Sequence, residues 1–159
     1  MKSIFTRNIP LLAGLFLLAG ASGTSTLFAQ STDTWVGGTG NNFSTTANWN
    51  YSSSSGPVAS GDSLVFAAAG STTPNNDETG FGFPAINFAA GAQAYTIGGN
   101  PFTLSTSTAA TVISVSSANA QTINNNITLG NAVQTISLAS GNLTHGGTVS
   151  GLLVENMSD

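Results

Sequence analysis

The side chains in this sequence that could act as acids, bases or metal ligands are few. After Ala29 the chain has six carboxylates and one His, and it has no Lys, Arg or Cys. Glycoside hydrolysis needs two carboxylates on opposite sides of the bond to be cleaved. Only Asp77 and Glu78 are close in sequence, and adjacent residues of a strand point to opposite faces. A hydrolase is therefore not predicted. The six carboxylates are Asp33, Asp62, Asp77, Glu78, Glu155 and Asp159.

Other catalytic and metal chemistry lacks its usual residues. A polysaccharide lyase generally needs a basic residue to remove a proton and cations to neutralise a uronate, and no Lys or Arg follows Arg7. His145 is followed by two Gly, which favours a turn residue, and no nucleophile-elbow motif surrounds a Ser. The run 75–78, Asn-Asn-Asp-Glu, has oxygen ligands without a known Ca²⁺-loop spacing, which favours a polar turn. We expect no enzyme activity, no cofactor and no metal site.

Aromatic residues give the one candidate binding surface. Trp35, Trp49 and Tyr51 lie close together in sequence and could stack on a sugar as glycan contacts. The same rings, together with Phe43, could instead cover the open end of a repeat structure, and this interpretation is favoured. Buried rings would indicate such a cap, whereas accessible rings would indicate a sugar-binding platform.

Charge and composition exclude several partners. Only 5% of residues are charged, and from Gln30 onward the net charge is −6. Binding to phosphate backbones needs Lys or Arg, so no nucleic-acid partner is expected. Ser, Thr, Asn and Gly make up about half of that region. Its partners are predicted to be a cell-surface glycan or protein.

The segment 1–29 is typical of a secretory signal peptide. Lys2 and Arg7 precede an apolar stretch at 9–19, which is shorter than the roughly 20 residues that span a membrane. Cleavage is predicted after Ala21 or Ala29, which leaves no embedded membrane segment. The protein is therefore expected to be secreted or exposed on the cell surface.

The exported region has the pattern of short strands separated by turns. No stretch has apolar residues at helical spacing with helix caps. Three segments share Thr-Ile followed by a polar turn and a second apolar residue, which predicts a repeat of stacked strands. They begin at Tyr95, Gln121 and Gln134. The second interval is half the first, so the repeat unit contains either one strand or two.

Two all-β folds fit this repeat. A parallel β-helix with turns of about 20–25 residues is favoured because recurring Asn and Thr can form aligned ladders. The alternative is an antiparallel β-sandwich. We predict a signal peptide at 1–29, a Trp-rich N-terminal cap at 30–70 with an exposed Ser loop, β-strand repeats at 71–151 and an off-pattern tail at 152–159. An open C-terminal edge would invite self-association.

Several motifs of the exported region occur together in one known family. The motifs are Trp35, Gly37-Gly38, Asn48-Trp49, Pro57, Gly61-Asp62, Phe66, Ile86-Asn87-Phe88, Gly91-Ala92, Tyr95-Thr96-Ile97-Gly98-Gly99-Asn100 and the segments 140–144 and 146–151. Residues 33–151 thereby resemble autotransporter-associated β-strand repeat proteins, which are long secreted passengers of bacteria.

The resemblance implies a right-handed parallel β-helix stalk, exposed at the cell surface. Members of that family continue through many further repeats, so this chain is expected to be a truncated fragment. The predicted function is that of a non-catalytic structural segment of an adhesin-type passenger. The alternative is a small secreted glycan-binding module that uses the Trp-rich end.

Overall fold

The computed structural model describes residues 31–52, 57–68, 70–104, 110–130, 133–151 and 153–157 of the 159-residue chain. These residues form short strands and one three-residue 3-10 helix, η1 (Thr46–Asn48), which confirms the all-β prediction. The predicted signal segment lies outside the described residues, as do 53–56, which include most of the predicted Ser loop. Among the described residues, no helix has the length and hydropathy needed to cross a membrane.

Fifteen strands follow one another along the described part of the chain. They are β1 (Thr32–Trp35), β2 (Trp49–Tyr51), β3 (Ser63–Phe66), β4 (Asn75–Asn76), β5 (Gly82–Phe83), β6 (Ile86–Phe88), β7 (Thr96–Gly99), β8 (Phe102–Leu104), β9 (Ala110–Val115), β10 (Gln121–Ile123), β11 (Ile127–Leu129), β12 (Gln134–Leu138), β13 (Leu143–His145), β14 (Val149–Ser150) and β15 (Leu153–Met157).

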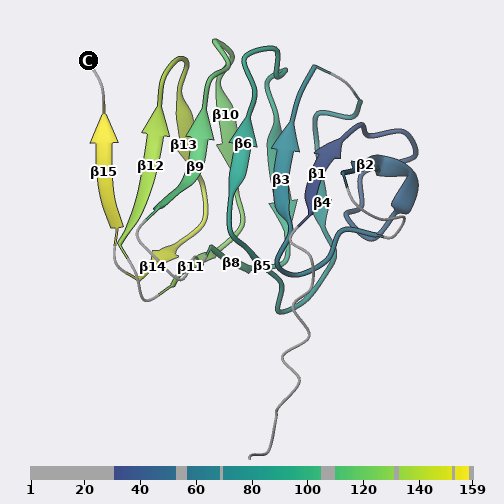
Figure 1. Ribbon diagram of the computed structural model, residues 1–159, viewed down its shortest axis with the longest axis horizontal. Coiled ribbons are helices and arrows are strands. Elements are labelled where there is room, and N and C mark those ends of the chain that lie inside the picture. Colours follow the sequence, from purple (N-terminus) through teal and green to yellow (C-terminus); the bar gives the residue numbers. More distant parts are fainter. Residues whose placement is uncertain are drawn as a thin grey trace, which may run out of the picture.

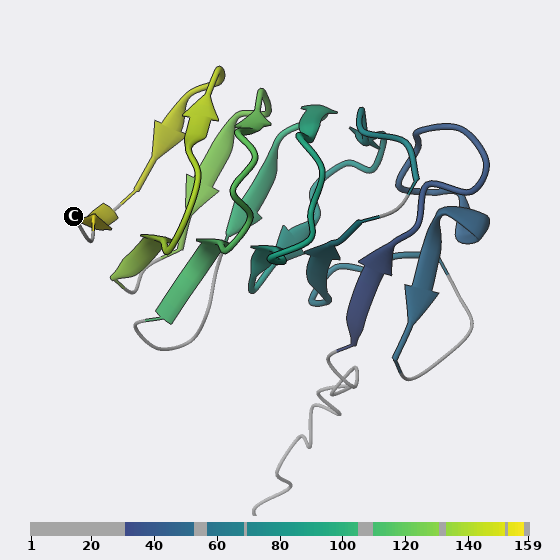
Figure 2. The ribbon, with the colours of Figure 1, turned by 90° about the horizontal axis from the view of Figure 1, so that it is seen from above.

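The strands are sorted into three sheets that wrap around one core (Figure 1, Figure 2). Sheet 1 has the order β15-β12-β9-β6-β3-β1-β2, sheet 2 the order β13-β10-β7-β4 and sheet 3 the order β14-β11-β8-β5. From β3 onward, each turn of the chain adds one strand to each sheet, and the paired strands run parallel. Among the described strands only β1 and β2 pair antiparallel. The parallel β-helix is thereby confirmed, and the alternative antiparallel sandwich is wrong.

Successive turns stack with residues in register, although the turns differ in length. A turn is short where Ile136 pairs with Glu155 and longer where Ile86 pairs with Ile113. Thr96 pairs with Thr122, so the predicted repeat from Tyr95 to Gln121 is one full turn. The third predicted copy, which begins at Gln134, is not equivalent because it lies in sheet 1 rather than sheet 2. The step from Gln121 to Gln134 covers only part of a turn, so that similarity relates strands on two different sheets.

The core is made of columns of inward-pointing side chains. Because alternate residues of a strand point to the same side, β3 and β6 each send two apolar residues inward. Phe66 stacks on Phe88 with ring centroids 5.3 Å apart, and Val115 continues that column in β9. The column beside it passes from Leu64 to Ile86. Aromatic rings thus fill the first turns and aliphatic side chains fill the later ones.

Buried amides join successive turns at the corners of the solenoid. The side-chain amides of Asn76 and Asn125 both donate to the backbone carbonyl of Asn100, each at 2.9 Å. Gln121 donates in the same way to the carbonyl of Gln93 at 2.9 Å. A buried carbonyl without a partner costs about 1–3 kcal/mol. These contacts give the abundant Asn a structural role.

Within the predicted off-pattern tail, the described residues 153–157 continue the solenoid. β15 pairs parallel with β12 along its whole length, from Gln134 with Leu153 to Leu138 with Met157. The tail sequence departs from the Thr-Ile pattern, but a parallel ladder is formed by backbone groups and tolerates many side chains. Likewise β3, inside the predicted cap, pairs with both β1 and β6, so the cap and the repeats share sheet 1.

Candidate functional site

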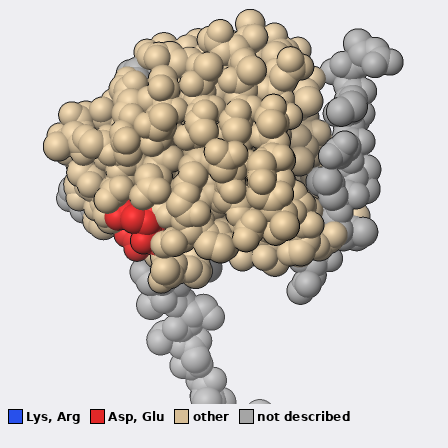
Figure 3. Space-filling model, turned by 180° about the vertical axis from the view of Figure 1, so that it is seen from behind, with Lys and Arg blue, Asp and Glu red and all other residues tan. Residues whose placement is uncertain are grey.

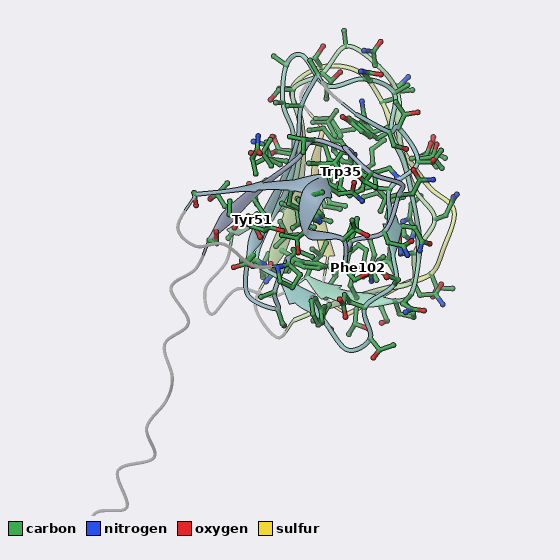
Figure 4. All side chains as sticks on the ribbon, turned by 90° about the vertical axis from the view of Figure 1, so that its right-hand side faces the viewer. Trp35, Tyr51 and Phe102 are labelled. Atoms are coloured by element: carbon green, nitrogen blue, oxygen red, sulfur yellow. The ribbon has the colours of Figure 1, made fainter. Side chains whose placement is uncertain are left out.

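The aromatic residues predicted to cover the first turn lie together at one end of the solenoid. Trp35 of β1 and Trp49 of β2 meet edge to face, with ring centroids 5.0 Å apart and planes at 79°. Phe43, from the loop between these strands, packs on Trp49 at 5.1 Å and 78°. Figure 4, viewed from this end, shows Trp35 within the cross-section of the solenoid. Edge-to-face packing is favourable for aromatic rings, and the cluster closes this end of the core.

The two indole rings present no open face to a sugar. The exposed fraction of Trp35 is 0% and that of Trp49 is 3%. The indole N–H of Trp35 donates to the carbonyl of Ser71 at 2.8 Å, and that of Trp49 donates to the carbonyl of Phe43 at 2.9 Å. Stacking on a sugar needs an accessible ring face. In this structure Trp35 and Trp49 therefore belong to the cap rather than to a glycan-contact surface.

Tyr51 differs from the two Trp residues because it is only half-buried. It ends β2, at the side of the solenoid in Figure 4. Its hydroxyl donates to the carbonyl of Thr46 at 3.1 Å. Burial, together with the negative charge of Asp33, raises the pKa of Tyr51 above its usual value. Of the three predicted glycan contacts, Tyr51 alone keeps part of its ring accessible, and one isolated ring makes a small platform.

Two carboxyl groups are buried beneath the cap. Asp33 of β1 is 0% exposed and lies in register with the core residue Leu64. Asp62 is 8% exposed. Ser31 joins them, because its hydroxyl donates to Oδ1 of Asp33 at 2.7 Å and its backbone N–H donates to Oδ1 of Asp62 at 3.1 Å. Oδ2 of Asp33 has no hydrogen-bond partner among the described residues.

The electrostatics of this carboxyl pair favour a bound proton. Burial raises the pKa of Asp33 from 3.8 to about 6; the hydrogen bond from Ser31 opposes this rise, and the negative charge of Asp62 adds to it. No Lys or Arg follows Arg7 in the sequence, so neither residue type can offset the charge of this pair. A buried charge without a partner is costly, and the group neutralises itself instead. We therefore expect Asp33 to take up a proton as the pH falls below about 6, well above its usual range.

A third carboxylate, that of Asp77, forms hydrogen bonds between the first turn and the cap. Asp77, which follows β4, accepts hydrogen bonds from the backbone N–H of Ser44 at 3.0 Å and from its hydroxyl at 2.5 Å. Burial raises the pKa of Asp77, but the hydrogen bonds from Ser44 outweigh it and hold that pKa below 3.8. The described residues contain no group of three or more His, Cys, Asp or Glu side chains that could hold a metal ion together. The contact of Asp77 is with the cap loop.

His145 lies in a strand and not in the turn that the sequence predicted. It ends β13, in register with the buried Ile123 of the preceding turn. Its imidazole is half-buried, and its Nε2 has no hydrogen-bond partner among the described residues. The two Gly that follow form the corner after the strand, which explains why the local sequence resembled a turn. His145 occupies a core position on the last complete turn.

Comparison of this chain with protein-family models, with curated proteins and with solved structures gives no match in any of the three. The resemblance to autotransporter-associated repeat proteins rests on the motifs of the sequence and stays a prediction.

The sequence analysis did not predict the buried carboxyl pair, although the burial of Asp33 could have been predicted. Asp33 is two residues before Trp35 in the same strand, so alternation places both side chains on one side. A Trp predicted to be buried therefore predicts a buried Asp33 as well. Asp62 could not be assigned in this way, because it meets Asp33 through the turn between Ala59 and Asp62 and through contacts of Ser31.

Proposed function

We propose that this chain is a non-catalytic structural segment of an autotransporter-like, adhesin-type passenger, secreted or displayed on the cell surface. The observation that carries the proposal is the repeated geometry of the turns. Every turn from β3 onward adds one strand to each of three sheets. Such a solenoid grows in length by adding turns to the same three sheets, which is the property required of a stalk.

The outer surface supports the same role. Thr96, Thr122 and Thr144 form a column of hydroxyl-bearing residues along the outside of sheet 2. In the view of Figure 3 the described surface has one acidic patch and is otherwise uncharged. An uncharged column can be stacked many times without the repulsion that like charges on neighbouring strands would cause. Hydroxyl and amide groups keep such a surface hydrated.

Export of the chain tests the proposed location. The full chain with a C-terminal epitope tag would be produced in a Gram-negative host, beside a control that starts at Gln30 after an added Met. We expect the full chain outside the cytoplasm, cleaved after Ala21 or Ala29, and the control inside. Mass spectrometry and protease treatment of intact cells measure both outcomes. Retention of an uncut full chain in the cytoplasm would contradict the proposal.

Duplication of one turn tests the structural role. Thr122 and Thr144 are stacked one turn apart, so a second copy of residues 122–143 inserted after residue 143 adds one turn in register. We expect this variant to be exported and to unfold cooperatively, with a larger strand signal in circular dichroism. A scrambled insert of the same composition is the matched control. Loss of folding or export by the duplicated variant alone would contradict a role as an extendable stalk.

A further inference from the structure

A shallow groove lies on the outside of the solenoid, at the corner between sheets 2 and 3. Its volume is about 240 Å³. Eight residues line it, and none of them carries a charge; they include Phe81, Asn100, Pro101, Thr103 and Thr128. They come from the turn before β5, the turn between β7 and β8, and the strands β8 and β11. Phe102, which lines the groove, is labelled in Figure 4 below Trp35.

The groove combines an apolar lining with neutral polar groups. Phe81 is half-buried and packs edge to face on the buried Phe83, with ring centroids 6.1 Å apart. Pro101 is exposed beside it. The side-chain amide of Asn100 has no hydrogen-bond partner among the described residues, since only its backbone carbonyl and backbone N–H are engaged. An amide can donate and accept at once, so this group is available to a ligand with hydroxyls.

A row of hydroxyl groups leads away from the groove. Thr103 lies in register with Thr128, and Thr128 lies in register with Ser150 of the next turn. All three belong to the outer side of sheet 3, on neighbouring strands about 4.8 Å apart. Hydroxyls along this row can bond to further units of a chain-like ligand whose first unit fills the groove.

We propose that this groove binds one residue of a neutral saccharide chain, with the ring carbons on Phe81 and Pro101 and the sugar hydroxyls on Asn100 and Thr128. Ligand sites of this kind combine apolar walls with a few placed polar groups, and pockets for larger ligands measure about 300–1,000 Å³. A groove of about 240 Å³ suits a single ring. The uncharged lining and the net charge of −6 from Gln30 onward both disfavour acidic sugars. This activity goes beyond the proposed structural function, which its failure would leave standing.

Titrations followed by amide NMR test the proposal. The purified protein is titrated with cellotriose, mannotriose, maltotriose and β-galactotriose to about 10 mM, so that a Kd on the order of 1 mM is detected. Trigalacturonate serves as the acidic counterpart. We expect at least one neutral trisaccharide to shift the amide signals of Phe81, Thr103 and Thr128, and trigalacturonate to shift none of them.

Two variants and a matched control locate the contacts. Asn100→Ala removes an amide that has no hydrogen-bond partner among the described residues, and Thr128→Val removes a hydroxyl that accepts only a long, exposed hydrogen bond of 3.5 Å from Ser150. Each change should weaken binding about tenfold. Thr122→Val makes the same change on the outside of sheet 2 and should leave binding unchanged. Unchanged binding by Asn100→Ala and Thr128→Val would overturn the proposal. So would shifts centred on Tyr51 instead of the groove, equal binding of trigalacturonate, or no shift with any of the four neutral sugars.

Discussion

The two ends of the solenoid are built differently although the same ladders run through both. At the cap end, β1 and β2 cover the first turn, and Trp35 is 0% exposed. At the other end, Val149 of β14 lies in register with the buried Ile127, yet it is 41% exposed. The same inward position is thus buried in one turn and open in the last. A stacked repeat cannot bury its own terminal layer, so an added element has to cover it.

Each end of the solenoid has a polar side chain at a core position, and the cap buries its polar side chain completely. It brings Asp33 into the core column that Leu64 continues, and that carboxyl has an oxygen without a partner among the described residues. At the open end, His145 takes a core position, but its imidazole is only half-buried. Water therefore reaches the polar side chain at the open end but not the one at the closed end. We expect substitutions and pH changes at the closed end to alter the free energy of unfolding more than those at the open end.

The largest expected effect is the loss of the central ring of the cap. Trp35→Ala removes a fully buried side chain that contacts three other rings and should lower the free energy of unfolding by about 3–5 kcal/mol. The matched change at the open end is Leu143→Ala, where the half-buried side chain should cost about 1 kcal/mol. Urea unfolding followed by circular dichroism measures both. Equal losses would mean that the cap stabilises the core no more than the last turn does.

The second effect is a dependence of cap stability on pH. The fold raises the pKa of Asp33, so the folded state binds a proton there more tightly than the unfolded chain does. The resulting stabilisation of the folded state is fully present below the ordinary pKa of 3.8 and is lost as the pH rises through about 6. That loss should be on the order of 1–3 kcal/mol, because one unit of pKa corresponds to about 1.4 kcal/mol and solvent screening reduces the effect. The pKa of Asp77 is lowered, so its contribution is lost in the opposite direction, as pH falls below 3.8. Stability should therefore be greatest near about pH 4.

Asp33→Asn isolates this effect, because the amide stays neutral across the range. The variant should show none of the loss between about pH 4 and 6 that the parent protein shows, as measured by urea unfolding at each pH. Asp77→Asn is the control and should keep that loss. A parent protein whose stability does not fall between about pH 4 and 6 would contradict the raised pKa of Asp33.

The third effect compares two equivalent corners. A Cβ added to Gly99, which has a φ of +97°, would clash with the carbonyl oxygen of Asn76, and one added to Gly147 would clash with that of Asn125. Gly99→Ala should cost about 1–3 kcal/mol, because turns on both sides hold this corner in place. Gly147→Ala should cost less, since the last turn can shift. Gly98→Ala, with open space around its Cβ, is the control for thermal unfolding.

These contrasts show which features the sequence could predict. Short strands, the parallel stacking and the aromatic cap follow from composition and from local repeats such as Thr96-Ile97 and Thr122-Ile123, which are in register. The strand β15 could not be predicted, because it pairs with β12 through backbone groups and its sequence lacks the Thr-Ile pattern of the repeats. The groove was also missed: Phe81 and Pro101 are far apart in sequence and meet only through the stacking of turns.

The smallest effect on stability, and the sharpest test of the two ends, is the change of a single edge residue to Lys. Unpaired edge strands with exposed apolar residues favour association with another copy. Val149→Lys places a charge at the open end and should alter stability by no more than about 0.5 kcal/mol. It should nevertheless abolish the concentration-dependent association that we expect of the parent protein in sedimentation velocity.

Asn50→Lys makes a like change of charge at the opposite edge, where the residue is exposed on β2. This variant should associate as the parent protein does, because the cap and its antiparallel β1–β2 pair protect that end. If both variants became monomeric, net charge rather than the open edge would control association. If the parent protein were itself monomeric at every concentration, the exposed Val149 would be insufficient to recruit a second copy, and the difference between the ends would concern folding stability alone.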